Sequence, residues 1–130
     1  MNMATQQVTH SDDETIEQEI QRKGKTAPRV TVAELEAAIA SEHYFTAGEG
    51  VAGATGQYPN GGHPGQPLAL LTFCVLVLRN GFTVTGESAC ASPENFDAEI
   101  GRKVARQNAV SKMWPLLGYL LKERLHDAAN

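Results

Sequence analysis

The side chains best suited to chemistry lie around one strand-to-helix turn in the C-terminal half of the chain. They combine acidic, hydroxyl, amide and basic groups: Glu87, Ser88, Asn95, Asp97, Arg102, Lys103 and Gln107. On a helical wheel Lys103 and Gln107 fall within an apolar stripe, where a polar group needs a partner. Glu87 is the candidate partner of Lys103. The cluster predicts a ligand-binding or partner-binding site, and the alternative is an internal salt bridge or a lysine that extends to solvent.

No recognisable catalytic arrangement accompanies this cluster. Ser88 lies near Cys90, but no base and orienting group stand at recognisable positions. The four histidines are scattered, without a second His or Cys at metal-ligand spacing. The segment from Gly48 to Gly53 matches the dinucleotide-binding pattern as a string, but we expect it to follow a helix and to open none, which is the wrong context. The sequence therefore predicts a protein that is not an enzyme and holds no metal or cofactor.

The element that must position the cluster is a β-hairpin, with strands expected near 69–79 and 82–89. Asn80-Gly81 between apolar runs favours a two-residue type I′ turn, which would pair Arg79 with Phe82. This register puts one set of residues on the face that we take as the core face: Phe73, Val75, Val77, Phe82 and Val84. The first strand is apolar on its other face too, and such a run is typical of burial on both sides.

Two helices should flank the hairpin, which gives a small α+β domain in the order helix, hairpin, long kinked helix. Thr31 and Glu34 form a capping box that predicts a helix over 32–44. Ser92-Pro93 predicts the start of the C-terminal helix, and Pro115 should kink or break it. The apolar stripe expected on this helix is Phe96, Ile100, Val104 and Trp114.

The rest of the chain should be accessory to this domain. Residues 1–30 are predicted to be a flexible acidic N-terminal arm, with 1–11 disordered and 12–23 compatible with a helix. Residues 31–126 form the predicted core domain. Within it, residues 46–67 contain seven glycines and three prolines, and we expect a disordered loop rather than a functional one.

Charge and hydropathy limit the possible partners. The net charge is −4, and residues 1–67 carry nine acids against four Lys or Arg, whereas residues 68–130 carry six against seven. This balance argues against a nucleic-acid-binding protein, because unspecific binding needs a basic surface. We expect no secretory signal, and the longest apolar run, near 68–78, is too short to span a bilayer. We expect a cytoplasmic protein that binds no membrane, with Cys74 and Cys90 as reduced thiols.

Apolar surface that the predicted core leaves over points to a homo-oligomer, most simply a dimer. The interface residues would be Cys74, Leu76 and Leu78 on the first strand with Gly101, Ala105 and Ala109 on the long helix. Two-fold symmetry would let one such patch cover itself. The alternative is that the segment 116–125 folds back beyond Pro115 and covers the strand within one chain.

An ordered series of motifs in the C-terminal half resembles a known family. The motifs are Asn80-Gly81-Phe82, Gly86-Glu87-Ser88-Ala89-Cys90, Asn95-Phe96-Asp97, Glu99-Ile100-Gly101, Ala105, Ala109, Lys112-x-Trp114 and Gly118-Tyr119-Leu120. They are similar to the small tailed-phage proteins typified by gene product forty-nine of phage N-four and gene product sixty-six of phage Sf-six. The resemblance implies a phage or prophage origin, a location in the host bacterial cytoplasm, and little chemistry.

Three functional hypotheses follow. The leading one is a small non-enzymatic phage protein that binds a host protein and modulates it during infection. The second is an oligomer that sequesters a small nucleotide-like signal at subunit junctions near residues 87–97, as a counter-defence protein would. The third is a nucleic-acid-binding accessory protein that uses Arg102, Lys103, Arg106 and Lys112.

Overall fold

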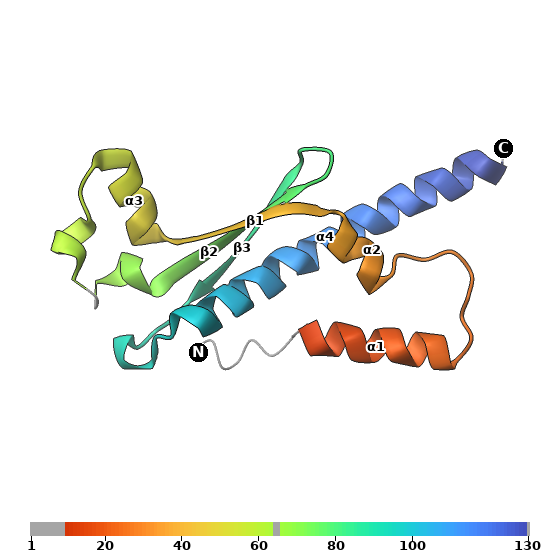
Figure 1. Ribbon diagram of the computed structural model, residues 1–130, viewed down its shortest axis with the longest axis horizontal. Coiled ribbons are helices and arrows are strands. Elements are labelled where there is room, and N and C mark those ends of the chain that lie inside the picture. The colour runs from red at the N-terminus through yellow and green to blue at the C-terminus, as the bar shows by residue number, and fades with distance from the viewer. Residues whose placement is uncertain (1–9, 64–65, 130) are drawn as a thin grey trace.

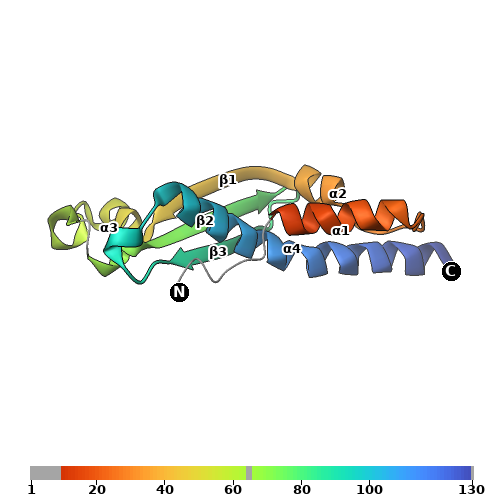
Figure 2. The same ribbon diagram turned by 90° about the horizontal axis from the view of Figure 1, so that it is seen from below.

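The computed structural model describes residues 10–63 and 66–129, which form a three-stranded antiparallel sheet with one long helix packed across one face (Figures 1 and 2). The strands, in sheet order, are β1 (Ile39–Thr46), β2 (Leu71–Leu78) and β3 (Thr83–Ala89). The α-helices are α1 (His10–Arg22), α2 (Val32–Ala37), α3 (Ala47–Thr55) and α4 (Ala98–Ala129). Short 3₁₀ turns η2, η3 and η4 occupy Pro59–Gly62, Pro67–Leu70 and Pro93–Asn95. The predicted α+β class is confirmed, and the sheet has one strand more than the hairpin.

Strand β1 occupies residues for which the sequence predicts a helix. Thr31 caps α2 as expected, since its hydroxyl accepts a hydrogen bond from the Glu34 amide at 3.0 Å, but the helix ends at Ala37. The residues that follow include several that favour extended backbone: Ile39, Tyr44, Phe45 and Thr46. The prediction of a helix over 32–44 is therefore wrong after its first six residues. A cap marks where a helix starts and does not determine how far it runs.

The predicted β2–β3 hairpin is present, but its register differs by one residue. The Leu78 amide donates to the Phe82 carbonyl at 2.8 Å, so three residues form the turn instead of two. Gly81 within it has φ of +90°, a left-handed conformation that glycine adopts without steric cost. Val77 consequently lies opposite Thr83. Because side chains alternate along a strand, a one-residue shift exchanges its two faces.

This exchange reverses the predicted core. The residues buried beneath α4 include Cys74, Leu76 and Leu78. The β2 residues of the predicted core face, Phe73, Val75 and Val77, are half-buried on the opposite face. Phe82 is 55% exposed, and of the five residues expected in the core only Val84 is buried.

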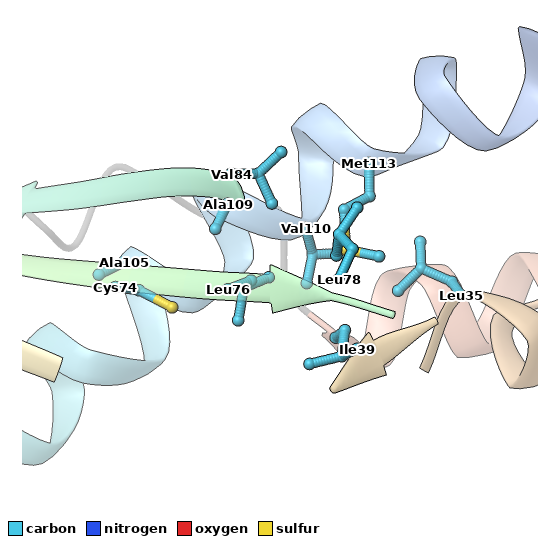
Figure 3. Close-up of a cluster of buried hydrophobic side chains, with 10 residues drawn as sticks. All are labelled: Leu35, Ile39, Cys74, Leu76, Leu78, Val84, Ala105, Ala109, Val110 and Met113. Carbon is cyan, nitrogen blue, oxygen red and sulfur yellow. The ribbon is translucent and has the colours of Figure 1, made fainter. Parts of the chain in front are cut away.

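Helix α4 approaches the sheet closely because small residues meet at the contact. Ala105 and Ala109 are fully buried on α4, and Gly86 lies against them on β3. A Cβ atom on Gly86 would overlap the Ala105 carbonyl oxygen and the Ala109 amide nitrogen. Figure 3 shows the core that surrounds this contact: Leu35, Ile39, Cys74, Leu76, Leu78, Val84, Ala105, Ala109, Val110 and Met113. The stripe of small residues therefore serves helix–sheet packing, and Ile100 of the predicted apolar stripe is 48% exposed.

Helix α4 begins later than predicted and continues further. Residues Pro93–Asn95 form a 3₁₀ turn, and α4 starts at Ala98, where the Asp97 carboxylate accepts a hydrogen bond from the Ile100 amide at 3.0 Å. The helix runs through Pro115 without the predicted break. A proline removes one backbone hydrogen bond, and the turns on either side keep theirs. The C-terminal half of α4 extends beyond the β2–β3 turn, as Figure 1 shows.

The segment 46–67, predicted to be a disordered loop, contains helix α3 and the 3₁₀ turn η2 in its described part, and the turn η3 begins at its last residue. Thr46 and Glu49 form a capping box, in which the Glu49 amide donates to the threonine hydroxyl at 3.1 Å and the Thr46 amide to the carboxylate at 2.8 Å. Gly56 ends the helix with φ of +83°. The glycines that suggested disorder thus lie partly inside a helix whose start is well capped.

The predicted flexible arm contains helix α1, which is fixed to the segment before α2. The Arg29 guanidinium donates to both carboxylate oxygens of Glu17, at 2.8 and 2.6 Å. The hydrogen bond from Arg29 is the main reason why the pKa of Glu17 is lowered from 4.5 to about 2. Trp114 of α4 lines the same cavity as Ile16 and Ile20 of α1. The prediction of disorder falls mostly on residues 1–9, which lie outside the described residues.

Candidate functional site

The most connected polar group in the described structure is Arg106, which joins α4 to α2 and β1. Its guanidinium contacts the Glu36 carboxylate at 2.8 Å and the Glu42 carboxylate at 2.9 Å. Tyr44 donates its hydroxyl proton to Glu42 at 2.7 Å. The hydrogen bond from Arg106 lowers the pKa of Glu42, and burial is the main cause that raises the pKa of Tyr44. These groups satisfy one another's hydrogen bonds, so the network holds α2, β1 and α4 together.

Cys74 lies beside this network and is an unsuitable nucleophile. It is fully buried, and burial raises the pKa of its thiol. A thiol with a raised pKa is protonated at neutral pH, whereas the thiolate is the reactive form. Cys74 and Cys90 are both free thiols.

The structure does not bring the sequence-predicted polar cluster together. Glu87 and Ser88 are neighbours on β3 but point to opposite faces of the sheet, Glu87 exposed and Ser88 buried. Lys103 is exposed and pairs with Glu99 at 3.5 Å, so its predicted pairing with Glu87 is wrong. The reason is local: Glu99 is one helical turn from Lys103, at the spacing where such pairs form on a helix surface.

The remaining members of the cluster have separate roles. Asp97 caps α4, and Asn95 lies in the 3₁₀ turn before it. Gln107 is buried on α4 as expected of a polar group within an apolar stripe. The buried Ser88 hydroxyl has no hydrogen-bond partner among the described residues. Of the predicted site residues, only Arg102 lines a cavity described below.

The predicted oligomer interface does not lie on the surface of one chain, except that Leu78 lines the wall of a groove described below. Cys74, Leu76, Leu78, Gly101, Ala105 and Ala109 are buried within one chain, where the strand and the helix cover each other. The one-residue register shift is the cause, because it turns the expected outer face of β2 toward α4. A second copy of the chain would have to use other surfaces.

The glycine-rich segment from Gly48 to Gly53 has a context different from the one expected. It follows strand β1 and lies inside α3, so the argument that it follows a helix is wrong. The glycines nevertheless lie in the helix itself, and the next strand, β2, is antiparallel to β1. The Glu49 carboxylate occupies the first turn of α3, where a bound pyrophosphate would need free amides. Dinucleotide binding therefore remains an unsupported interpretation.

A small cavity of about 220 Å³ lies between β1 and the start of α4. Its lining includes three aromatic side chains, one cation and one carboxylate: Tyr44, Phe45, Phe96, Arg102 and Glu49. Aromatic rings can stack on a planar ligand, and a guanidinium suits a phosphate or carboxylate. This is the described site closest to the ligand-binding hypothesis for residues 87–97.

The face of the sheet opposite α4 is apolar along its central strand. We call it the open face and define it by Leu71, Phe73, Val75 and Val77 of β2, with Phe45 of β1. The Phe45 and Phe73 rings stack with centroids 5.6 Å apart. Helix α3 contacts Phe45 at one end, and the described helices otherwise leave this face uncovered in Figures 1 and 2. The edge strands border it with Ser41, His43, Thr83, Thr85 and Glu87.

A second apolar surface is a groove of about 430 Å³ between the hairpin turn and the C-terminal half of α4. We call it the apolar groove; the side chains that form its two walls include Ala38, Leu78, Phe82, Leu116, Tyr119 and Leu120. Tyr119 is 68% exposed and Leu120 46% exposed. The groove was not predicted, because Phe82 was expected in the core and Leu120 was considered only in the alternative that residues 116–125 cover the strand.

No group of three or more His, Cys, Asp or Glu within 10–63 and 66–129 is arranged to hold a metal ion. Over the same part of the chain, every helix is too short or too polar to cross a bilayer.

Comparison with known proteins identifies the family. The sequence model of the Phage protein (N4 Gp49/phage Sf6 gene 66) family matches residues 30–125. This range begins just before α2 and includes the whole sheet and nearly all of α4. No curated protein and no solved structure matches the chain. Because the family match spans most of the sequence and the whole sheet, the chain belongs to the Phage protein (N4 Gp49/phage Sf6 gene 66) family.

Proposed function

We propose that this small phage protein acts by binding a protein of the infected bacterium, with the open face of its sheet as the recognition surface. The observation that carries the proposal is the row of apolar side chains on the uncovered side of β2. An antiparallel sheet with one solvated face normally alternates apolar and polar residues. Here β2 is apolar on both faces, which is typical of a strand that is buried on both sides when the protein is bound to its partner.

The composition of the open face also supports a protein partner. Its centre is apolar and aromatic, with the stacked Phe45 and Phe73 rings at one end. Its rim is polar, with exposed Thr83, Thr85 and Glu87 along β3. An apolar centre with a polar rim is the usual anatomy of a protein–protein interface.

A photo-crosslinking residue at Thr85 tests the proposal during infection or expression in a bacterial host. Thr85 is exposed and lies directly opposite Val75, so a partner seated on the open face would contact it. We expect one predominant crosslinked host protein, identified by mass spectrometry. The double variant Val75→Thr and Val77→Thr should abolish the crosslink, because it removes apolar area while keeping β-branched side chains.

The matched control is Ile100→Thr, which removes an exposed apolar side chain from α4, away from the open face. It should leave the crosslink unchanged. Circular dichroism should show that all variants remain folded, since the replaced side chains are only partly buried. A crosslink that survives the double variant, or that Ile100→Thr removes equally, would contradict recognition through the open face.

A second candidate function, sequestration of a small nucleotide-like ligand, is favoured by the cavity beside Arg102. The aromatic rings suit a base and Arg102 suits a phosphate, but the Glu49 carboxylate also lines the cavity. Its volume of about 220 Å³ is smaller than the pockets of roughly 300 to 1,000 Å³ that hold drug-sized ligands. Thermal-shift screening with nucleotides tests this candidate. A stabilisation that Arg102→Ala removes and Lys103→Ala retains would favour it over the first.

A further inference from the structure

The hydrogen bonds of β2 determine which main-chain groups lie at the outer edge of β1. The Leu78 amide donates to the Phe82 carbonyl and the Cys90 amide donates to the Leu70 carbonyl, so the even-numbered residues of β2 bond toward β3. In an antiparallel sheet successive residues direct their N–H and C=O groups to opposite sides, so the odd-numbered residues of β2 bond to β1. The register then gives the residues of β1 whose main-chain groups point away from the sheet: Glu42, Tyr44 and Thr46.

The corresponding edge of β3 is obstructed by α4. The same alternation directs the main-chain groups of Thr83, Thr85 and Glu87 away from β2. The side-chain amide of Asn108 on α4 donates to the Glu87 carbonyl at 2.8 Å. A strand added to β3 would have to displace this side chain, and covering an edge in this way protects a sheet from unwanted pairing.

The outer edge of β1 is closed at its ends and open in the middle. At one end the Glu49 carboxylate accepts a hydrogen bond from the Thr46 amide at 2.8 Å. At the other end the register with β2 shifts after Ile39, as at a β-bulge. Within 10–63 and 66–129, no residue pairs with the outward main-chain groups of Glu42 and Tyr44, and β1 forms one margin of the sheet in Figure 2. The open part is therefore short and lies at the centre of the strand.

We infer that this part of β1 receives an extended segment of the same protein that the open face binds, which adds a fourth strand to the sheet. The inference rests on the proposed function and specifies the conformation of the partner. Glu42 and Tyr44 each direct one N–H donor and one C=O acceptor outward, two residues apart. An extended backbone presents donors and acceptors with the same two-residue repeat, so it is the chemical group that matches this edge.

Continuity with the open face favours a segment of the partner over a second copy of this chain. His43 and Phe45 of β1 point to the open face, so an added strand would place every second side chain beside them. Apolar side chains there would extend the row that ends with the stacked Phe45 and Phe73 rings, and the rest of the partner would cover that row. Two copies joined through β1 would instead add their open faces into one larger exposed apolar surface.

Replacing the Tyr44 amide by an ester tests the inference without changing a side chain. Incorporation of the α-hydroxy analogue of tyrosine at position 44 removes the outward N–H and keeps the hydroxyl that bonds to Glu42. The matched control is the α-hydroxy analogue of threonine at position 85, because that N–H points outward at the obstructed edge of β3. Each ester weakens the inward hydrogen bond of the preceding carbonyl, so circular dichroism and urea unfolding should find the two variants equally folded.

The probe is a library of short random linear peptides displayed on ribosomes and selected on the immobilised full chain. Because strand addition relies mainly on main-chain hydrogen bonds, a random library should contain binders. We expect enriched peptides with apolar residues at alternate positions. Their dissociation constant, measured by fluorescence anisotropy, should rise roughly tenfold for the Tyr44 ester, as expected for one lost hydrogen bond, and stay unchanged for the Thr85 ester.

Three peptide-binding results would overturn the inference: no enriched peptide, binding that the Tyr44 ester leaves intact, or an equal loss with the Thr85 ester. A dimer of the full chain in light scattering that the Tyr44 ester splits would identify a second copy as the occupant and would overturn it too.

The double variant Val75→Thr and Val77→Thr separates this inference from the proposed function. Peptides that lose affinity with the double variant alone would leave the open face in place and refute strand addition. Peptides that are sensitive only to the Tyr44 ester would support strand addition and contradict recognition through the open face.

Discussion

Replacing Gly86 by alanine should force α4 away from the sheet and destabilise the fold. The added Cβ would overlap the Ala105 carbonyl oxygen and the Ala109 amide nitrogen, and it would lie 2.8 Å from the Asn108 carbonyl carbon. These are backbone atoms of a helix, so they cannot swing aside as the end of a flexible side chain can. Either α4 or β3 must move, and both movements loosen the core around the fully buried Leu76.

The magnitude follows from the kind of contact. Overpacking a well-packed core usually costs about 1 to 3 kcal/mol, and more where the surroundings cannot yield. Because three backbone atoms oppose the new methyl group, we expect a loss of about 3 kcal/mol or more in the free energy of unfolding. A domain of this size is typically stable by about 5 to 15 kcal/mol, so the variant should still fold and its loss should be measurable.

Urea unfolding followed by far-UV circular dichroism measures this loss, and Gly53→Ala is the matched control. Gly53 lies inside α3, and nothing is within 4 Å of the Cβ that an alanine would add there. Alanine should therefore leave stability unchanged or raise it by about 0.5 to 1 kcal/mol, as for other helical glycines. If Gly86→Ala unfolded at the same urea concentration as Gly53→Ala, the close helix–sheet contact would be refuted.

Three further predictions concern the core, the arm and the ion-pair network. Leu76→Ala should cost about 2 to 5 kcal/mol in urea unfolding because Leu76 is fully buried, whereas Phe82→Ala should cost far less because Phe82 is 55% exposed. The pKa of Glu17 is lowered to about 2, so its contact with the segment before α2 stabilises the docked arm above pH 4.5 and is lost as the pH falls toward 2. The fluorescence of Trp114, the single tryptophan, should change over that pH range while the far-UV circular dichroism signal stays constant. The variant Glu17→Gln should already show the changed fluorescence at pH 7. Unchanged fluorescence in both experiments would refute the docking of the arm. Arg106→Met should cost about 1 to 2 kcal/mol, because two partly exposed carboxylates lose their shared partner, and an unchanged urea midpoint would mean that the network is unimportant.

The hairpin and the C-terminal helix were predictable because their signals are local. Apolar runs around Asn80-Gly81 specify a reversal, and the sequence after residue 92 has the composition of a helix. Register was not predictable in the same way, since a three-residue turn with Gly81 at positive φ fits the same letters as a two-residue turn. The small residues Gly86, Ala105 and Ala109 indicate the correct register, but only through their contact in the folded structure, which the sequence does not show.

The third strand and the polar network depended on contacts between distant parts of the chain. Arg106 bonds to Glu42, which is 64 residues away, and to Glu36, which is 70 residues away. No spacing rule links such pairs, so the sequence indicated Arg106 only as a contact to nucleic acid. Strand β1 likewise gains its hydrogen bonds only from β2, while the segment before it begins with a helix cap at Thr31. The apolar groove was missed for a related reason, because it forms between two elements that were each expected to be covered.

The position of α4 at the end of the chain affects how the protein folds during synthesis. When the ribosome has completed β3, all three strands exist, but α4 is not yet present to cover its face of β2. Folding must wait until Ala105, Ala109 and Met113 have emerged. During that delay the nascent sheet has apolar faces and unpaired edges, which favour association with other chains. A chain terminated before Met113 should therefore aggregate or be degraded, and it should accumulate as soluble protein only if a chaperone holds it.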